Sequence, residues 1–297
     1  MKQFGIDVSR WQGAFDFAKA KAEGVTFVII KGGGGDDGLY VDSRFAENYQ
    51  KAKAQGLNVG CYWFSKALTV EQARQEASYF YQHCCKDRQF ELPVFMDVEN
   101  KEQLALGKRA LTDVVRAWLE KIESYGMYGG IYSFRAAFPV YFYDEELSAV
   151  PHWVASWTKT CSFQPMGIWQ FGGETNLLRS NKIAGVVCDQ DYLLTDYPSQ
   201  IKAAGKNGFS PSQSQPPSQS DPAPDTCTVS LPVLQRGSNS GFVKTAQILL
   251  NAYFDAGLAV DGGFGAKTYA AVVAYQKNRG LTADGVIGRQ TWRQLLC

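Results

Sequence analysis

The chain has 297 residues, of which 45% are hydrophobic and 20% charged, with a formal net charge of +1. This length allows one large and one small domain, and the composition is that of a soluble globular protein. It gives no basic excess that would favour nucleic acid as a partner, and it lacks the long apolar run needed for membrane insertion. The first residues, Met1–Asp7, lack the basic and apolar stretches of a signal peptide, so we expect synthesis in the cytoplasm without one.

Charge and cysteine are distributed unevenly. From Cys227 to Cys297, seven Lys and Arg residues face three Asp, a net charge of +4, which suits either an anionic polymer or an ordinary solvated surface. The odd count of seven cysteines argues against a full disulfide framework, although Cys227 and Cys297 bracket the last segment and could pair in an oxidising setting. With only two histidines, His83 and His152, we expect no metal site, no cofactor and no histidine-based catalysis.

In the first two thirds of the chain, apolar β-rich runs alternate with helical stretches. This alternation predicts an α/β fold, with a parallel sheet closed as a TIM-like β/α barrel. Shorter β-like runs without convincing helices follow, so we expect the end of the barrel to be irregular and flattened. The expected strands are Phe4–Val8, Thr26–Lys31, Asn58–Phe64, Val94–Val98, Gly129–Ser133, His152–Trp157, Met166–Phe171 and Val186–Asp189, and the expected helices are Phe15–Glu23, Ser43–Gln55, Val70–His83 and Ala110–Tyr125.

A Pro/Ser/Gln-rich stretch, Gly208–Pro224, is almost free of apolar side chains and is typical of an extended linker. We therefore predict a first domain over residues 1–205, a linker over 206–226 and a second domain over 227–297. The second domain contains an internal repeat, because Asp261–Thr268 is followed by the similar Asp284–Thr291. A helical stretch precedes each copy, which predicts a small all-α module of two units.

Four carboxylates stand at ends of predicted strands. Asp97 and Glu99 end the run Pro93–Glu99, and their spacing places both side chains on the same face of a strand. Asp7 ends the first strand and Asp189 the last. If these strands meet at one barrel mouth, the four acids converge there, which favours glycosidic acid/base chemistry over a structural salt bridge. Asp191, two residues after Asp189, is an alternative candidate for the same position.

Residues 1 to about 200 resemble the lysozymes of glycoside hydrolase family 25. The matching segments are Gly5–Gly13, Phe27–Lys31, Tyr40–Phe45, Gly60–Phe64, Asp97–Glu99, Ile131–Ser133, Trp153–Trp157, Trp169–Gln170 and Val187–Asp189. The C-terminal repeat resembles peptidoglycan-binding domains with D-G-x-x-G-x-x-T signatures. The two resemblances together imply an enzyme that hydrolyses the β-1,4 bond between N-acetylmuramic acid and N-acetylglucosamine, with peptidoglycan as partner.

The family resemblance implies that Glu99 is the general acid and that Asp97 is its partner, which orients the N-acetyl group or stabilises the cationic transition state. Asp7 and Asp189 match the remaining acids, and the motif favours Asp189 over Asp191. Whether the N-acetyl group or water attacks remains open. Aromatic residues near strand ends are candidates for stacking on the sugar rings: Tyr62, Tyr132, Trp11, Trp63 and Trp157.

We expect a monomer or weak oligomer that acts as a phage endolysin, reaching the wall after release from the host cytoplasm. A bacterial or prophage autolysin of the same chemistry is the alternative, and a non-catalytic wall-binding lectin is a weaker one because all four acids are retained. A wall amidase or peptidase would need zinc ligands or a Cys/His pair, which the two histidines do not support.

Overall fold

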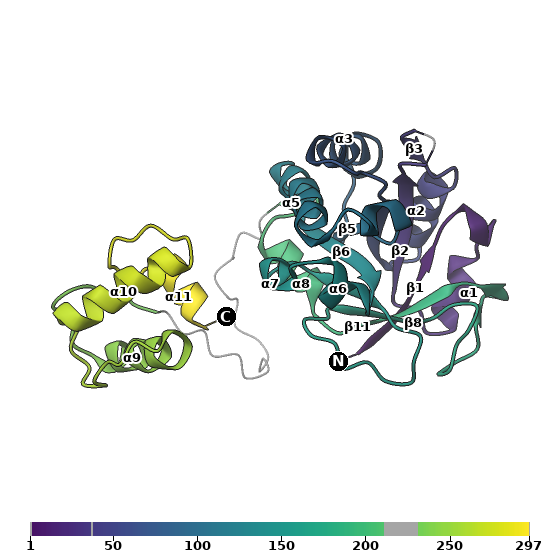
Figure 1. Ribbon diagram of the computed structural model, residues 1–297. Coiled ribbons are helices and arrows are strands. Elements are labelled where there is room, and N and C mark those ends of the chain that lie inside the picture. Colours follow the sequence, from purple (N-terminus) through teal and green to yellow (C-terminus); the bar gives the residue numbers. More distant parts are fainter. Residues whose placement is uncertain (1, 37, 211–230, 297) are drawn as a thin grey trace. The chain divides into compact units, whose positions relative to one another are not determined.

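The computed structural model describes residues 2–36, 38–210 and 231–296. The chain divides into two compact units, Met1–Gln215 and Pro216–Cys297 (Figure 1). The predicted pairing of Cys227 with Cys297, and most of the predicted linker, lie outside the described residues. None of the described helices has the length and apolarity that a membrane crossing requires.

In the described part of the first unit, eight strands close a barrel, which confirms the predicted β/α barrel fold. The strands, in their order around it, are β1 (Gln3–Val8), β2 (Phe27–Gly34), β4 (Asn58–Phe64), β5 (Val94–Asp97), β6 (Gly129–Phe134), β7 (His152–Ala155), β8 (Ile168–Gly172) and β11 (Asp189–Leu193). The pairings from β1 through β2 to β8 are parallel, whereas β11 runs antiparallel to both β8 and β1. Three short strands lie outside the ring: β3 (Tyr40–Val41) on β2, and β9 (Lys182–Ile183) paired with β10 (Val186–Val187).

The expected strand Val186–Asp189 is wrong. Val186–Val187 forms β10, outside the barrel, and Asp189 begins β11 instead of ending a strand. Because β11 is antiparallel to its neighbours, its first residue lies at the end of the barrel where the parallel strands finish. Asp189 therefore reaches the expected mouth from a strand that runs in the opposite direction.

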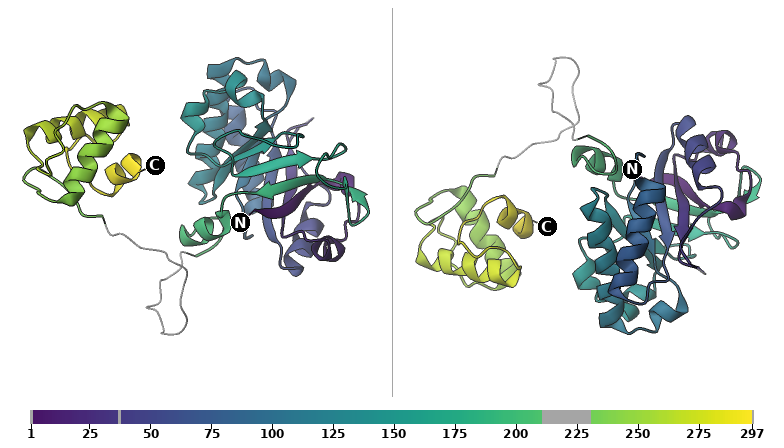
Figure 2. Two further views of the ribbon diagram at one scale, coloured as in Figure 1. Left: turned by 90° about the horizontal axis from the view of Figure 1, so that it is seen from below. Right: turned by 90° about the horizontal axis from the view of Figure 1, so that it is seen from above.

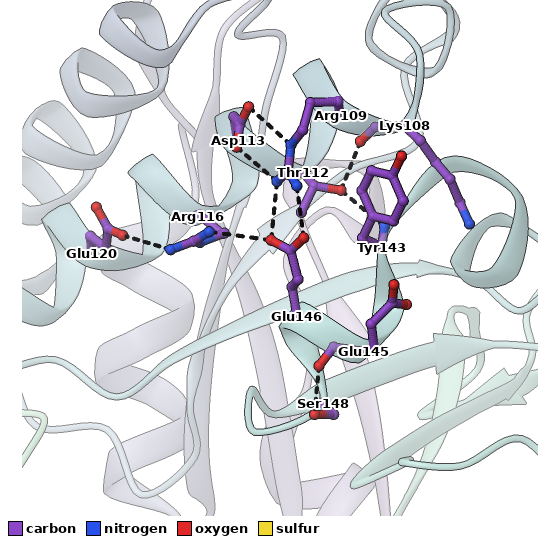
Figure 3. Close-up of polar contacts among 10 residues, drawn as sticks. All are labelled: Lys108, Arg109, Thr112, Asp113, Arg116, Glu120, Tyr143, Glu145, Glu146 and Ser148. Carbon is purple, nitrogen blue, oxygen red and sulfur yellow. Dashed lines mark hydrogen bonds and ion pairs between the residues drawn. The ribbon is translucent and has the colours of Figure 1, made fainter. Parts of the chain in front are cut away.

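Helices surround the strands (Figures 1 and 2). They are α1 (Phe17–Ala22), α2 (Phe45–Ala54), α3 (Val70–Phe80), which continues as a π-helical turn (Tyr81–Cys85), α4 (Lys101–Leu104), α5 (Lys108–Ser124), α6 (Ala137–Tyr141), α7 (Asp144–Leu147) and α8 (Tyr197–Ala203). The long helix α5 is tied to α7 by an exposed ion-pair network, in which Arg109 donates to both Asp113 and Glu146, and Arg116 also contacts Glu146 (Figure 3).

The strands bury both of their faces, because alternate side chains point to opposite sides. One apolar cluster, which includes Val28 and Ile30, lies between the strands and the helices. The other fills the barrel interior and includes Phe27, Ile29 and Phe95. Glycines make room for these rings: a Cβ on Gly5 would lie 2.5 Å from the Phe27 ring, and one on Gly130 would lie 2.6 Å from the Phe95 ring.

The first unit extends beyond the predicted boundary at residue 205. Asn207 is fully buried, donates from Nδ2 to the backbone oxygens of Phe90 and Leu92, and accepts from the Tyr128 amide. Phe209 also packs against the interior cluster. The predicted end of the first domain at residue 205 is too early. Asn207 and Phe209 belong to the packed first unit, although their sequence resembles the start of the linker.

The second unit contains α9 (Gly241–Phe254), α10 (Ala266–Asn278) and α11 (Arg289–Leu296) around an apolar core. Its sequence repeat is also a repeat of hydrogen bonds. Gln247 Nε2 donates to Asp261, Gly263 and Thr268, and Gln276 Nε2 donates to Asp284, Val286 and Thr291. Each copy thus closes its turn on a buried glutamine, which explains why the Asp, Gly and Thr positions recur.

Candidate active site

The carboxylates predicted to converge do meet at one mouth of the barrel. Asp7 ends β1 beside Asp189 on β11, where the two residues are directly paired. Asp97 ends β5, and Glu99 follows two residues later. Asp7 and Asp97 are 6% and 5% exposed, whereas Glu99 presents its side chain to solvent. The mouth therefore holds both nearly buried acids and one that can reach a substrate.

The environment raises the pKa of all four acids. Burial is the main cause for each of them. The pKa of Asp7 is raised further by the nearby charges of Asp189 and Asp191, and that of Asp97 by Glu99. The pKa of Asp189 is raised to about 6. A cluster of this kind can keep protons at pH values where ordinary carboxyl groups have lost them, as a general acid requires.

Lys31, in β2, places a positive charge at this site. Its positive charge counteracts the rise in pKa of both Asp97 and Glu99. Its ammonium group also lies 5.9 Å from the centre of the Tyr62 ring and 4.8 Å from that of Phe64. Lys31 belongs to the matching segment Phe27–Lys31 but was not predicted as a site residue. A lysine directly after the buried apolar run Phe27–Ile30 was the available signal.

Gln170 connects the two sides of the mouth and was also missed. It donates from Nε2 to Asp7 Oδ2 at 2.9 Å, and its Oε1 accepts from Tyr132 and Trp157, each at 3.2 Å. Gln170 thereby fixes the orientation of Asp7 and lowers its pKa somewhat. A buried amide on an otherwise apolar strand was the signal for this role.

The five aromatic candidates have different environments. Trp11 is 77% exposed on a short 3₁₀ helix after β1, which is held by a capping box between Ser9 and Gln12. Trp157 is 39% exposed just after β7, where its ring lies against Gly173, leaving no room for a Cβ. Tyr62 is half-buried with its ring edge against Trp153, and Tyr132 is 8% exposed at the floor of the mouth.

The assignment of Trp63 to the sugar-binding surface is wrong. Trp63 is fully buried on the outer face of β4, where it packs against Phe80 and donates its indole N–H to Glu76. Its neighbour Tyr62 faces the barrel interior, so the strand alternation sends Trp63 to the opposite side. Adjacent aromatic residues on one strand cannot both line the same mouth.

Asp189 and Asp191 both point into the barrel, and the sequence left open which of them belongs to the mouth. The burial of their side chains distinguishes them. Asp189 is partly accessible at the mouth, whereas Asp191 is fully buried beneath it and accepts from Trp153 Nε1 at 2.8 Å. Only Asp189 is placed to contact a substrate. Among the described residues, no group of three or more His, Cys, Asp or Glu side chains could hold a metal ion.

Two family models match the chain. Glycosyl hydrolases family 25 matches residues 6–178, and a peptidoglycan binding domain matches residues 239–295. Lysozyme M1 of Streptomyces globisporus is 26% identical over 208 residues, which cover 63% of this chain and 65% of that protein, slightly less than two thirds of its length. The autolytic lysozyme of Clostridium acetobutylicum is 26% identical over 97% of this chain and 76% of its own.

Among solved structures, the CTP1L endolysin superposes with a TM-score of 0.57 at 24% identity, covering 68% of this chain and 70% of that one. This similarity establishes the fold of the first unit. The family match covers more than half of the chain and includes the segments that carry Asp7, Asp97 and Glu99. The chain therefore belongs to glycosyl hydrolases family 25.

Proposed function

We propose that this protein hydrolyses the β-1,4 bond between N-acetylmuramic acid and N-acetylglucosamine in bacterial peptidoglycan. The observation that carries the proposal is the pairing of Asp97 and Glu99 at the end of β5, in a mouth shared with Asp7 and Asp189, where burial raises the pKa of every acid. The family membership and the relatives named lysozymes support the same substrate class.

Glu99 is the general acid in this proposal. It is the most accessible of the four acids, and its raised pKa lets it carry a proton to the glycosidic oxygen as the bond to the sugar breaks. Asp189, with a pKa of about 6, faces the same space and is ionised at neutral pH, where a negative charge stabilises an oxocarbenium-like transition state.

Asp97 acts on the substrate's N-acetyl group. Among the described residues, no group donates to or accepts from Asp97 Oδ1, although this atom is buried. A buried polar atom without a partner is costly, and Asp97 keeps 5% of its surface open to the mouth, where a donor of the substrate can approach it. An amide next to the reacting carbon supplies that partner, which supports attack by the N-acetyl oxygen over direct attack by water.

The second unit holds the enzyme on its polymeric substrate. Its match to a peptidoglycan binding domain and the net charge of +4 over residues 227–297 support this role. The protein works as a monomer in this proposal, since one barrel supplies the four acids.

We further propose that the protein acts as an endolysin, made in the cytoplasm and admitted to the wall when the membrane is breached. The similarity to a solved endolysin supports this role, and the relative named an autolytic lysozyme supports the alternative of an autolysin. Expression inside a bacterium distinguishes them: cells that stay intact until the membrane is permeabilised indicate an endolysin, whereas spontaneous lysis indicates export.

Mass spectrometry of digested, purified peptidoglycan tests the reaction itself. We expect fragments whose new reducing ends are on N-acetylmuramic acid, and no fragments from Glu99→Gln. New ends on N-acetylglucosamine, or cleaved peptides, would assign the chain a different activity.

A further inference from the structure

Asp191 lies beneath the proposed catalytic acids and takes no part in the mechanism described above. It is fully buried, and its Oδ1 accepts from Trp153 Nε1 at 2.8 Å. Among the described residues, no N–H or hydroxyl group donates to its second oxygen, Oδ2. A buried carboxylate oxygen without a donor needs a partner that carries a proton.

That partner is Asp7. In the antiparallel pair of β1 and β11, Asp191 lies opposite Gly5 and diagonal to Asp7 on the same interior face. Gly5 has no side chain of its own to come between the neighbouring carboxyl groups, and a hydrogen bond between them accounts for the donor that Asp191 Oδ2 otherwise lacks. Two carboxyl groups can make that bond only if one of them is protonated.

Asp7 is the proton donor of the pair. Its Oδ2 is already occupied as the acceptor of Gln170 Nε2, and Asp189 and Asp191 both place negative charge beside it. Asp191 receives the indole N–H of Trp153, which stabilises its ionised form. The other titratable groups that face Asp7 are Cys188, Tyr62 and Tyr132, and among the described residues no lysine or arginine forms an ion pair with either aspartate.

We propose that Asp191 is a positioning residue, which shares one proton with Asp7 and so holds Asp7 in a single orientation with one negative charge for the pair. This role rests on the proposed function, because the site that Asp191 positions is the proposed wall-cleaving site. Burial and the neighbouring charges raise the pKa of both aspartates, which agrees with a proton retained at neutral pH.

Asp191→Asn should keep the hydrogen-bonded pair intact. The asparagine amide can donate to an ionised Asp7, while its oxygen accepts from Trp153, so the geometry survives with the direction of one hydrogen bond reversed. The pair then carries one negative charge at neutral pH, as in the unmodified protein, but cannot gain a second charge at alkaline pH. Asp191→Asn should therefore clear walls at nearly the normal rate at neutral pH and keep its activity further into the alkaline range, whereas Asp191→Ala should be impaired throughout.

Carbon-13 NMR of the carboxyl carbons in the full-length protein tests the shared proton directly and needs no enzymatic activity. We expect Asp7 and Asp191 to respond in the same titration step and to hold one proton between them at pH 7. In Asp191→Asn, the midpoint of Asp7 should fall by about one pH unit or more, a tenfold loss of proton affinity.

Asp189→Asn is the matched control, because it removes a charge beside Asp7 without breaking the hydrogen bond to Asp191, and the joint step should persist. Two ionised carboxylates at pH 7 in the unmodified protein would overturn the proposal, and so would an unchanged midpoint in Asp191→Asn. If that variant does not fold, the titration of the unmodified protein decides alone. A protein that failed to cleave walls would still give this titration, so the two proposals fail separately.

Discussion

The aspartates of the barrel mouth and those of the C-terminal module have opposite pKa shifts. In the module, Asp261 and Asp284 each accept from a backbone amide and a buried glutamine, and these bonds lower their pKa. In the barrel, burial raises the pKa of Asp97 and Asp7, and the charges of neighbouring acids raise it further. Ionised aspartates therefore stabilise the second unit, whereas ionisation of the aspartates at the barrel mouth lowers the stability of the first.

This difference separates structural from functional carboxylates. A carboxylate that serves folding is surrounded by donors that favour its charge, whereas one that serves acid catalysis is placed where its charge is disfavoured. The cost is tolerated in the barrel because a large apolar core surrounds the mouth. The following predictions test whether the two kinds of carboxylate respond in opposite ways to substitution.

The largest effect is expected for Glu99→Gln. The glutamine keeps the shape of the side chain but cannot donate its proton to the leaving oxygen, so turnover should fall by about 10²-fold or more. Turbidity clearing of purified walls measures this loss, and a pull-down with walls should show unchanged binding through the second unit. Glu145→Gln, an exposed site with the same change of charge, is the control and should be fully active. Clearing at a near-normal rate by Glu99→Gln would place the acid elsewhere.

The second prediction separates the two units. A fragment of residues 1–210 should unfold cooperatively by itself, because the acids and both apolar clusters belong to it. A fragment of residues 1–205 loses Asn207, whose side chain makes three buried hydrogen bonds, and should be less stable by about 3 kcal/mol or more. Thermal unfolding of both fragments measures the difference. Equal stability would show that Asn207 contributes little, and an insoluble longer fragment would show that the units depend on each other.

The barrel was predictable from the sequence because its parallel strands are continuous apolar runs, such as Phe27–Ile30, whose length and spacing identify them. Asp97 and Glu99 could be assigned because two acids ending such a strand have few structural explanations. The antiparallel direction of β11 could not be predicted, since a single short strand carries no signal of its direction. Trp63 was misassigned because the alternation of side chains along β4, which places it on the face opposite Tyr62, was not applied to the two aromatic residues. Asp191 was ambiguous because it shares its face with Asp189.

The third prediction contrasts one aspartate from each unit. Asp189 has a pKa of about 6, above its ordinary 3.8, so its ionisation destabilises the fold as the pH rises from about 4 through 6. Asp189→Asn removes this cost and should stabilise the first unit by at most about 3 kcal/mol at pH 7, while reducing activity more than Asp191→Asn does. As the pH falls below about 3 the gain should vanish, because the carboxyl is then protonated in both states.

Asp284→Asn should act in the opposite direction on the second unit. The ionised Asp284 is stabilised by the Val286 amide and Gln276, so its contribution is present at neutral pH and is lost as the pH falls through its lowered pKa. The melting temperature of the isolated module should therefore fall at pH 7 and approach that of the unmodified module in acid. Shifts of the same sign for Asp189→Asn and Asp284→Asn would contradict the distinction between the two kinds of carboxylate.

The smallest effect is expected for Glu146→Gln, on the surface of the first unit (Figure 3). Glu146 accepts from Arg109 and Arg116, and these contacts lower its pKa, as in the module. Unlike Asp284, it is paired with side chains that solvent already hydrates, so little free energy is gained when the ion pairs form. The melting temperature should fall only slightly at pH 7, and less at high salt, where exposed charges are screened.

Glu145→Gln, one residue away and without an ion pair to a described residue, is the control. A loss as large as that of Asp284→Asn would mean that pairing alone, and not the burial of the partner Gln276, determines what an exposed carboxylate contributes to the fold.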